Sequence, residues 1–412
     1  MSPPVPPPRF APADLPALAE RVGRMLDDAW HAPGFCVPNP DTYPHQWLWD
    51  SCFHAIVWDA LGDGRGLTEL ATTMASMDAS GFVPHMTYWH GPSLHADFWG
   101  RPTTSIITQP AMYGHAARRL HEPHGRSIDP ELSERIARAL GYLLFDRVRT
   151  DGNLVAVLHP WETGCDDSPR WDDHRHRGEE WSTTKGDLVA VLRERFDGDD
   201  AGRIGAGGSG GLPFVVGSIG FNALLVWNTR EYLATDGAVG HDRLGPAADG
   251  VAAAVAARWD PARCTWVDDA PRVEGSVGSA AASASARTAD TMLGLLVDPR
   301  PEALAQLHRS TGFGAPFGPR GVHNDEPGYA PDLYWRGPAW PQLCYLLWQA
   351  ALAMADDEAA RALARSLVAG ARGSGFAEYW HPDTGQGLGA IPQTWAGLAL
   401  PAAQWMVAQA SG

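Results

Sequence analysis

The sequence predicts an all-α protein, a single domain over residues 1–412 folded as an (α/α)6 barrel (a toroid) with long functional loops at one end. Three observations predict this class. Apolar residues recur at helical spacing in about twelve segments, the polar connections alternate between short and long, and strand-like segments are few and short. Helices joined in this way form hairpins that can close into a double-layered ring. An open solenoid of helical hairpins is the alternative, and the absence of a repeated sequence motif argues against it.

The predicted elements follow one another in chain order. Residues 1–11 form a flexible, proline-rich lead, after which Leu15, Leu18 and Val22 begin the first amphipathic helix. The predicted helices span residues 12–31, 43–61, 65–78, 109–122, 128–148, 179–195, 217–236, 243–259, 279–296, 338–355, 357–372 and 394–409. The best strand candidate is 154–158. The glycine-rich stretch 205–211 is expected to be a mobile lid or a linker, because no strand precedes it and no Gly-Lys-Ser/Thr follows it.

The amino-acid composition argues against some classes of binding partner. The formal net charge of −16 argues against nucleic acid and against anionic membrane surfaces, since both attract basic proteins. Eighteen tryptophans against nine tyrosines and twelve phenylalanines suit stacking on carbohydrate, although most of them are expected in the core. The tryptophan content therefore makes a carbohydrate one candidate ligand. The sequence leaves open whether the protein is a homo-oligomer.

Cysteines and targeting signals point to the cytoplasm. The five cysteines are scattered and contain no Cys-x-x-Cys pair, so neither a disulfide framework nor a zinc site is predicted. The N-terminus has neither the charged nor the apolar region of a signal peptide, and no run of about eighteen apolar residues occurs. We expect a cytoplasmic protein without a membrane partner, a cofactor or a metal. The tract 174–177, His-Arg-His-Arg, is expected to be a solvated loop because it lacks paired acids at ligand spacing.

The segment 159–171 is the first candidate functional loop. It concentrates three carboxylates, an arginine and two indoles between proline and glycine, which break regular structure. Indoles beside a carboxylate form a stacking platform and raise the pKa of the acid. The alternative is an acidic loop pinned by a single Arg–Asp pair.

Three further segments place polar groups among aromatic rings. They are 43–50, which contains Asp50, 334–341, which contains Arg336, and 375–385, which contains Glu378. Asp50 is either a structural acid at a helix start or an acceptor for sugar hydroxyls. Arg336 either pairs with a carboxylate in a sugar pocket or belongs to a buried ion pair that stabilises the fold.

These segments, in this order, resemble glycoside hydrolase family 63. Residues 162–171, Glu-Thr-Gly-Cys-Asp-Asp-Ser-Pro-Arg-Trp, are similar to the family's general-acid loop, and 376–385 are similar to its general-base segment. Residues 334–340 match its Tyr-Trp-Arg-Gly-Pro-x-Trp motif, and 47–50 match its Trp-x-Trp-Asp motif. The resemblance runs from about residue 43 to 396. It is closest to small bacterial enzymes that act on glucosylglycerate and mannosylglycerate.

The resemblance implies an inverting glycosidase with Asp166 as general acid and Glu378 as general base, their carboxyl groups roughly 6.5–9.5 Å apart. It places the acid on Asp166 and not on the neighbouring Asp167. It also implies that Tyr43, Tyr334 and Gln393 bind a glycerate carboxylate. The substrate-binding residues that it implies are Tyr43, Trp47, Trp49, Asp50, His85, Tyr88, Gln109, Trp161, Gly164, Arg170, Tyr334, Trp335, Arg336, Gly337, Trp340 and Gln393.

The first expected substrate is glucosylglycerate, 2-O-α-D-glucosyl-D-glycerate, with mannosylglycerate or another small α-glucoside such as trehalose as the alternative. Two other classes remain. A non-catalytic sugar-binding toroid would be expected to have lost one carboxylate, yet both Asp166 and Glu378 are present. A polysaccharide lyase on the same type of barrel would need a basic groove for uronates, and the net charge of −16 argues against it.

Overall fold

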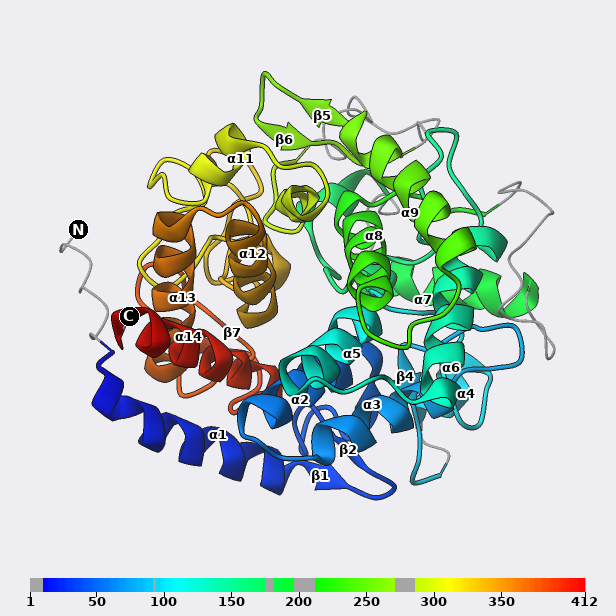
Figure 1. Cartoon of the computed structure of the whole chain (residues 1–412). Coiled ribbons are helices and arrows are strands. Elements are labelled where there is room, and N and C mark those ends of the chain that lie inside the picture. The colour runs from blue at the N-terminus through cyan, green and yellow to red at the C-terminus, as the bar shows by residue number, and fades with distance from the viewer. Residues whose placement is uncertain (1–9, 92–93, 175–180, 196–211, 271–285, 412) are drawn as a thin grey trace.

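The computed structural model describes residues 10–91, 94–174, 181–195, 212–270 and 286–411 (Figure 1). The chain is mostly helical, and its helices surround a common centre, with the first and last helices side by side. Within the described residues, strands are limited to four antiparallel pairs of two residues each. The pairs are β1 (Trp30–His31) with β2 (Phe35–Cys36), β3 (Gln46–Trp47) with β4 (Met86–Thr87), β5 (Trp259–Asp260) with β6 (Thr265–Trp266), and β7 (Tyr379–Trp380) with β8 (Gly387–Leu388).

Six helical segments form an inner ring. They are α2 (Leu48–Ala60), α5 (Tyr113–His121), α8 (Ile219–Leu233), the 3-10 helix η6 (Thr291–Leu296), α12 (Pro341–Ala353) and the 3-10 helix η8 (Thr394–Leu398). Each contacts the next in this order, and η8 contacts α2, so the circuit closes. Most residues of these inner segments are buried, as expected for helices surrounded by protein. In α2, for example, every residue from Leu48 to Trp58 is buried.

The outer layer consists of helices that bury only one stripe. They are α1 (Leu15–Asp28), α3 (Arg65–Ala75), α6 (Pro130–Gly141), α9 (His241–Ala256), α11 (Pro301–Gln306), α13 (Asp357–Gly373) and α14 (Ala399–Ser411). In α1 the stripe is Leu18, Val22, Met25 and Leu26, at the spacing of one helix face. The helices α3, α9, α11 and α13 pack on the inner segment that precedes each of them, and α14 packs between α13 and α1.

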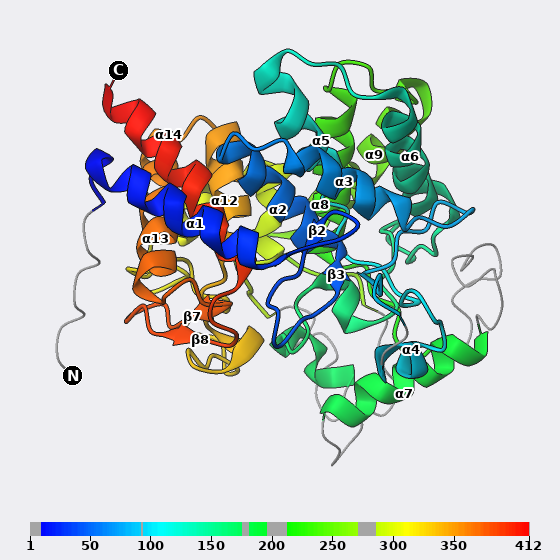
Figure 2. The ribbon, with the colours of Figure 1, turned by 90° about the horizontal axis from the view of Figure 1, so that it is seen from below.

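The two kinds of connection differ in length. Inner-to-outer turns such as 61–64 and 354–356 are short, whereas outer-to-inner connections such as 76–112, 142–218 and 374–393 are long. The long connections contain α4 (Leu94–Trp99), α7 (Trp181–Arg195) and most of the strands. Figure 2 shows β3, β7, β8, α4 and α7 on the same side of the ring. The alternation predicted from the sequence therefore places the long segments together at one end.

Most predicted helices are present, with shifted bounds, and two predictions need correction. The described part of 279–296 contains only η6, because Thr291 Oγ1 bonds to the backbone N–H and C=O of Thr288 and competes with a regular helix start. The segment 154–158 makes isolated bridges to Arg149 and Val216, not a strand. The short helices α4 and α11 were not predicted. The glycine-rich stretch 205–211 and residues 1–9 of the predicted flexible lead lie outside the described residues.

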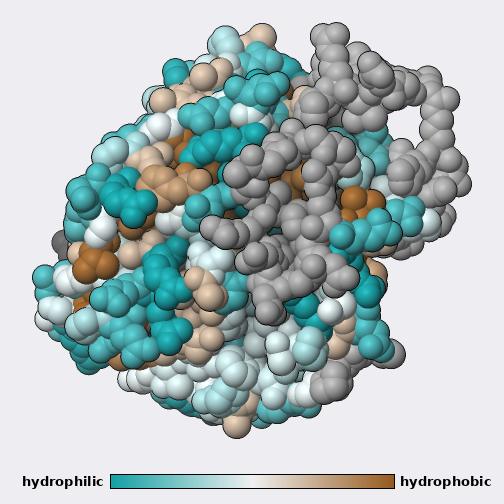
Figure 3. Space-filling model, turned by 90° about the vertical axis from the view of Figure 1, so that its right-hand side faces the viewer, coloured by the Kyte–Doolittle hydropathy of each residue, from teal (hydrophilic) through white to brown (hydrophobic). Residues whose placement is uncertain are grey.

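The surface seen in Figure 3 is mostly hydrophilic, and its hydrophobic areas are small and separate. Large apolar side chains with substantial exposure are scattered over the described residues: Phe98, Phe145, Val239, Leu333 and Ile391. Within those residues, no helix combines the length and the apolar character needed to cross a membrane.

Candidate active site

A cavity of about 410 Å³ is lined mainly by residues of the long connections and of the first turn of α2. Segments from Pro38 to Trp395, distant in sequence, therefore meet at one place. The predicted site residues that line the cavity are Tyr43, Trp47, Trp49, Asp50, His85, Gln109, Trp161, Gly164, Asp166, Tyr334, Trp335, Glu378 and Gln393. Both predicted catalytic carboxylates are among them.

The loop that carries Asp166 is held from both sides by buried ion pairs. Glu162 pairs with Arg147 and accepts hydrogen bonds from the backbone N–H groups of Leu158 and Thr108. Gly164 follows with a φ of 72°, and a Cβ at this position would lie 2.5 Å from the ring of Trp49, so only glycine fits here.

On the other side of Asp166, the guanidinium of Arg170 pairs with Asp268 and Asp290. All three residues are buried, and a buried arginine without such partners would be strongly unfavourable. These pairs tie the loop to the connection between α9 and η6 and fix the backbone around Asp166.

Asp166 is partly buried and accepts a hydrogen bond from the hydroxyl of Tyr334 at 3.4 Å. Burial raises its pKa to about 7, the nearby Lys185 opposes this shift, and the negative charge of Asp167 adds to it. Asp167 itself accepts a hydrogen bond from Lys185 Nζ at 2.7 Å. The two adjacent acids therefore differ in environment, and Asp166 is the one that lines the cavity.

Glu378 is only 3% exposed and lies just before β7. Its Oε1 accepts a hydrogen bond from the hydroxyl of Tyr43 at 3.1 Å, and its Oε2 accepts one from the backbone N–H of Ala390 at 3.0 Å. Burial raises the pKa of Glu378, while the two hydrogen bonds favour the ionised form and act against the shift. Glu378 is thus the better-stabilised anion of the two predicted catalytic acids.

A third carboxylate, Asp50, lies in the first turn of α2 and is also 3% exposed. Burial raises its pKa to about 7, and the positive charge that His54 would carry opposes this shift. A protonated Asp50 can donate as well as accept a hydrogen bond, which suits a sugar hydroxyl.

Polar groups without a protein partner also mark the cavity as a ligand site. Among the described residues, the indole nitrogen of Trp47 and the amide oxygen of Gln393 are buried and make no hydrogen bond. Both residues line the cavity, and a buried polar group is normally paired. A hydroxylated ligand would supply the missing partners.

Five residues implied as substrate-binding do not line the cavity, and the structure gives each another role. Trp340 lies behind Trp335, with ring centroids 3.6 Å apart and an interplanar angle of 1°. Arg336 pairs with the partly exposed Asp172. A Cβ on Gly337 would meet the carbonyl oxygen of Ala330 at 2.6 Å. The other two are Arg170, described above, and Tyr88, whose ring packs on His45 and His95.

The cavity also contains residues that the sequence analysis did not name. They are Pro38, Met86, His95, Phe98, Trp99 and Trp395. Three of them come from α4, where the sequence His-Ala-Asp-Phe-Trp at 95–99 is aromatic-rich enough to have been noticed. Trp395 follows Gln393 by two residues, and its indole N–H donates to the backbone carbonyl of Glu378 at 3.0 Å.

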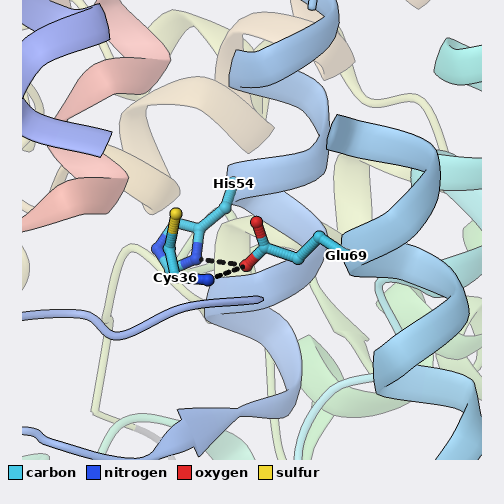
Figure 4. Close-up of side chains that lie close together, drawn as sticks. All are labelled: Cys36, His54 and Glu69. Carbon is cyan, nitrogen blue, oxygen red and sulfur yellow. Dashed lines mark hydrogen bonds and ion pairs between the residues drawn. The ribbon is translucent and has the colours of Figure 1, made fainter. Parts of the chain in front are cut away.

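One group of side chains has the composition of a metal site. Cys36, His54 and Glu69 are buried with potential donor atoms within 4.8 Å of one another (Figure 4). However, Glu69 already accepts hydrogen bonds from the backbone of Cys36, from His54 Nδ1 and from the indole of Trp58, and His54 Nε2 bonds to Thr394 Oγ1. These bonds use the potential ligand atoms of Glu69 and His54 to join α2, α3 and η8. The group is therefore explained as a buried hydrogen-bond network next to Gln393.

Comparisons with known proteins agree on one family. The family model described as the mannosylglycerate hydrolase MGH1-like glycoside hydrolase domain matches residues 43–396. The chain is 29% identical to mannosylglycerate hydrolase of Thermus thermophilus, over 89% of this chain and 96% of that protein. It is 25% identical to glucosylglycerate hydrolase of Mycolicibacterium hassiacum, over 95% of this chain and 98% of that protein.

A solved structure supports the same grouping. The crystal structure of a family 63 mannosylglycerate hydrolase from Thermus thermophilus, in complex with Tris and D-glycerate, aligns with a TM-score of 0.76 at 25% identity. The alignment covers 94% of this chain and 100% of that one. A neutral trehalase of Saccharomyces cerevisiae, at a TM-score of 0.54 and 14% identity, shares the fold over 95% of this chain and 81% of its own.

Proposed function

Because the chain belongs to glycoside hydrolase family 63, in the mannosylglycerate hydrolase MGH1-like group, we propose that it hydrolyses a hexosyl glycerate with inversion at the anomeric carbon. The chain is a glycoside hydrolase; the substrate, the stereochemistry and the roles of individual residues are the proposal. We also interpret the closed circuit of inner helices and its outer layer as an (α/α)6 barrel. The active site then lies at the end that carries the long connections.

The proposed mechanism is a single displacement. Asp166 protonates the glycosidic oxygen, while Glu378 removes a proton from the water that attacks the anomeric carbon on the opposite face. The glycerate leaves as the alcohol, and an α-linked hexose is released as the β-anomer. Tyr43 and Tyr334 orient the two carboxylates through the hydrogen bonds described above.

The observation that carries this proposal is the difference between the two carboxyl environments within one cavity. Burial gives Asp166 a pKa of about 7, which keeps a proton available, whereas two hydrogen bonds stabilise the anion of Glu378. Carboxyl groups whose environments differ in this way are suited to separate acid and base roles. A non-catalytic sugar-binding protein would have no need for this difference.

The substrate proposal rests on the relatives. Glucosylglycerate is the substrate expected from the sequence, and the relative from Mycolicibacterium hassiacum is a glucosylglycerate hydrolase. Mannosylglycerate is supported equally, because the relative from Thermus thermophilus is a mannosylglycerate hydrolase. The test is to incubate the protein with glucosylglycerate, mannosylglycerate, glucosylglycerol and trehalose and to measure the free hexose. Release from a hexosyl glycerate supports the proposal. Release from trehalose alone, or from none of the four, would refute it.

The pH dependence of kcat/KM is expected to be bell-shaped. Only protonated Asp166 can donate, and burial raises its pKa to about 7, so activity should fall as the pH rises through about 7. On the acid side, Glu378 must lose its proton, and because burial raises its pKa, this limb should lie above the range of an exposed glutamate. Steady-state kinetics across pH 4 to 9 checks this, and undiminished activity at pH 9 would contradict the role of Asp166.

Replacing Gln393 by alanine is expected to impair hydrolysis of glucosylglycerate selectively. The side chain of Gln393 lines the cavity, and its NH2 group can donate a hydrogen bond to the glycerate carboxylate. Loss of one such hydrogen bond corresponds to about a tenfold lower kcat/KM. Glucosylglycerol, which has no carboxylate, serves as the control. Equal losses on both substrates would show that Gln393 does not recognise the carboxylate.

A further inference from the structure

The helix α7 has no part in the mechanism above, yet one of its residues contacts the acid loop on both sides of Asp166. Lys185 Nζ donates a hydrogen bond to Asp167 Oδ1 at 2.7 Å, and it lies 5.4 Å from the centre of the Trp161 ring. The side chain of Lys185 is only 11% exposed. Figure 2 shows α7 at the end of the ring that carries the long connections. Lys185 therefore joins this helix to the loop that carries the proposed general acid.

The backbone of Lys185 makes a further contact with the same loop. Its carbonyl oxygen lies 3.2 Å from His159 Nε2, and His159 Nδ1 accepts a hydrogen bond from the backbone N–H of Trp161. Burial lowers the pKa of His159 to about 3, so the imidazole is neutral and its one N–H, at Nε2, donates to Lys185. The ring of His159 also packs on that of Trp161, with centroids 4.6 Å apart. Both the main chain and the side chain of Lys185 thus support Trp161, a residue of the cavity wall.

Asp166 and Asp167 are the two central residues of a tight turn. The backbone N–H of Ser168 donates to the carbonyl oxygen of Cys165 at 3.3 Å and closes this turn. Asp166 lines the cavity, whereas Asp167 is directed to Lys185 and its side chain is 32% exposed. Because both side chains leave the same turn, fixing Asp167 outside the cavity also fixes the direction in which Asp166 points.

The titratable groups that interact electrostatically with Asp166 come from several segments of the chain. They are Cys165 and Asp167 of the acid loop, Lys185 of α7, Tyr334 of the 3-10 helix η7 (Tyr334–Arg336), Glu378, and Tyr43. Burial and the charge of Asp167 raise the pKa of Asp166, and the charge of Lys185 lowers it. Arg336 is a second cation near Asp167. Among the described residues that line the cavity, none is a lysine or an arginine, so Lys185 acts from behind the wall.

From these contacts we propose that Lys185 is a positioning residue for the general acid, which directs Asp166 into the cavity and balances the negative charge of Asp167. The inference rests on the proposed function, because it takes Asp166 as the proton donor. It adds a third support to the acid loop, beside the ion pairs of Glu162 and Arg170, and this support acts on the turn that contains the acid itself.

The pKa of Asp166 tests the balance of charges. Lys185→Met keeps the length of the side chain but removes the cation, so the pKa of Asp166 should rise by about one pH unit. Asp167→Asn should lower this pKa, because asparagine removes the anion and still accepts the hydrogen bond from Lys185. In the double variant Lys185→Met/Asp167→Asn the two changes oppose each other, and the pKa should return close to that of the wild-type protein.

Carbon-13 NMR of protein labelled at the aspartate carboxyl carbons measures this pKa without a substrate. The signal of Asp166 is identified by its absence in Asp166→Asn. Arg193→Met is the matched control, because Arg193 is an exposed cation on the same helix that bonds to the backbone carbonyls of Asp97 and Phe98. This control should leave the pKa of Asp166 unchanged. An equally unchanged pKa in Lys185→Met would overturn the proposal.

Kinetics test the positioning. Lys185→Met is expected to lower kcat about tenfold at pH 6 with KM nearly unchanged, because the orientation of Asp166 matters during proton transfer. Lys185→Arg should restore most of this loss, since a guanidinium can pair with Asp167 and stack on Trp161. The alkaline limb of each variant should follow the pKa of Asp166 measured by NMR. Equal losses of kcat in the methionine and arginine variants would show that Lys185 serves the fold alone.

These outcomes are separate from those that test the proposed function. The kinetic comparison uses whichever of the four glycosides the wild-type protein cleaves. Cleavage of trehalose alone would refute the proposed substrate, and the Lys185 variants would then be compared on trehalose. An Asp166 pKa that does not respond to Lys185→Met would refute the role of Lys185 alone. A wild-type protein that cleaves none of the four would overturn both, since Asp166 would have no leaving group to protonate.

Discussion

Replacing Asp166 by asparagine is expected to lower kcat for the hexosyl glycerate by about 10³-fold or more, whereas Asp167→Asn keeps most of the activity. General acid catalysis contributes roughly 10²–10⁴-fold, and asparagine preserves the size of the side chain without supplying the proton. Asp167 is bonded to Lys185 and does not line the cavity. The two variants thus form a matched pair at adjacent positions, and steady-state kinetics at pH 6 compares them.

The pH profile of Asp167→Asn is also expected to shift relative to that of the wild-type protein. The negative charge of Asp167 raises the pKa of Asp166, so its removal should lower that pKa and move the alkaline limb of Asp167→Asn to lower pH.

Thermal unfolding at pH 8 provides the control for folding. Because the pKa of Asp166 is raised in the folded state, its ionised form is disfavoured there, and Asp166→Asn should not lower Tm at this pH. Equal loss of turnover in two folded variants would show that the acid has been assigned to the wrong residue.

Replacing Glu378 by alanine is expected to lower kcat by roughly 10³-fold or more, which is the second large effect. Without the general base, water is no longer activated on the face opposite the leaving group. Azide needs no deprotonation to attack, so it should restore turnover in this variant and yield the β-hexosyl azide, with Asp166 still protonating the departing glycerate. Mass spectrometry and NMR identify the product.

The matched control for this rescue is Asp166→Ala, in which the leaving group is unprotonated and azide should give far less recovery on the same substrate. Rescue of Asp166→Ala but not of Glu378→Ala would reverse the two assignments. An α-hexosyl azide from Glu378→Ala would contradict attack from the face opposite the leaving group.

The central part of the site could be predicted because its chemistry is local in sequence. The segments around Asp166, Glu378 and Asp50 each contain an acid beside indoles, and their order along the chain identified the family. The sequence alone does not show which side chains form hydrogen bonds with these carboxylates. The hydroxyls of Tyr43 and Tyr334 reach carboxylates 335 and 168 residues away, and only the folded ring brings them together.

Arg170 shows most clearly that a residue within a motif need not contact the substrate. Its position within the acid loop implied contact with substrate, yet its partners Asp268 and Asp290 lie on the connection between α9 and η6, and no local pattern links them to Arg170. The error for His95 is the opposite one, because this residue lines the cavity but was not predicted as a site residue. The helix α4 has six residues, too few for a periodic apolar pattern, so only its aromatic composition could have indicated a segment that lines the cavity. Similarly, the predicted helix 279–296 overlooked the side-chain bonds of Thr291 that compete with helix formation.

The anomeric configuration of the first product tests the account most directly. Proton NMR, recorded within the first minutes of glucosylglycerate hydrolysis and before mutarotation, distinguishes α- from β-glucose. Single displacement by water, with Asp166 as acid and Glu378 as base, predicts that β-glucose accumulates first and that the α-anomer appears only as mutarotation proceeds. Initial release of α-glucose would mean retention of configuration and would contradict the proposed roles of both carboxylates.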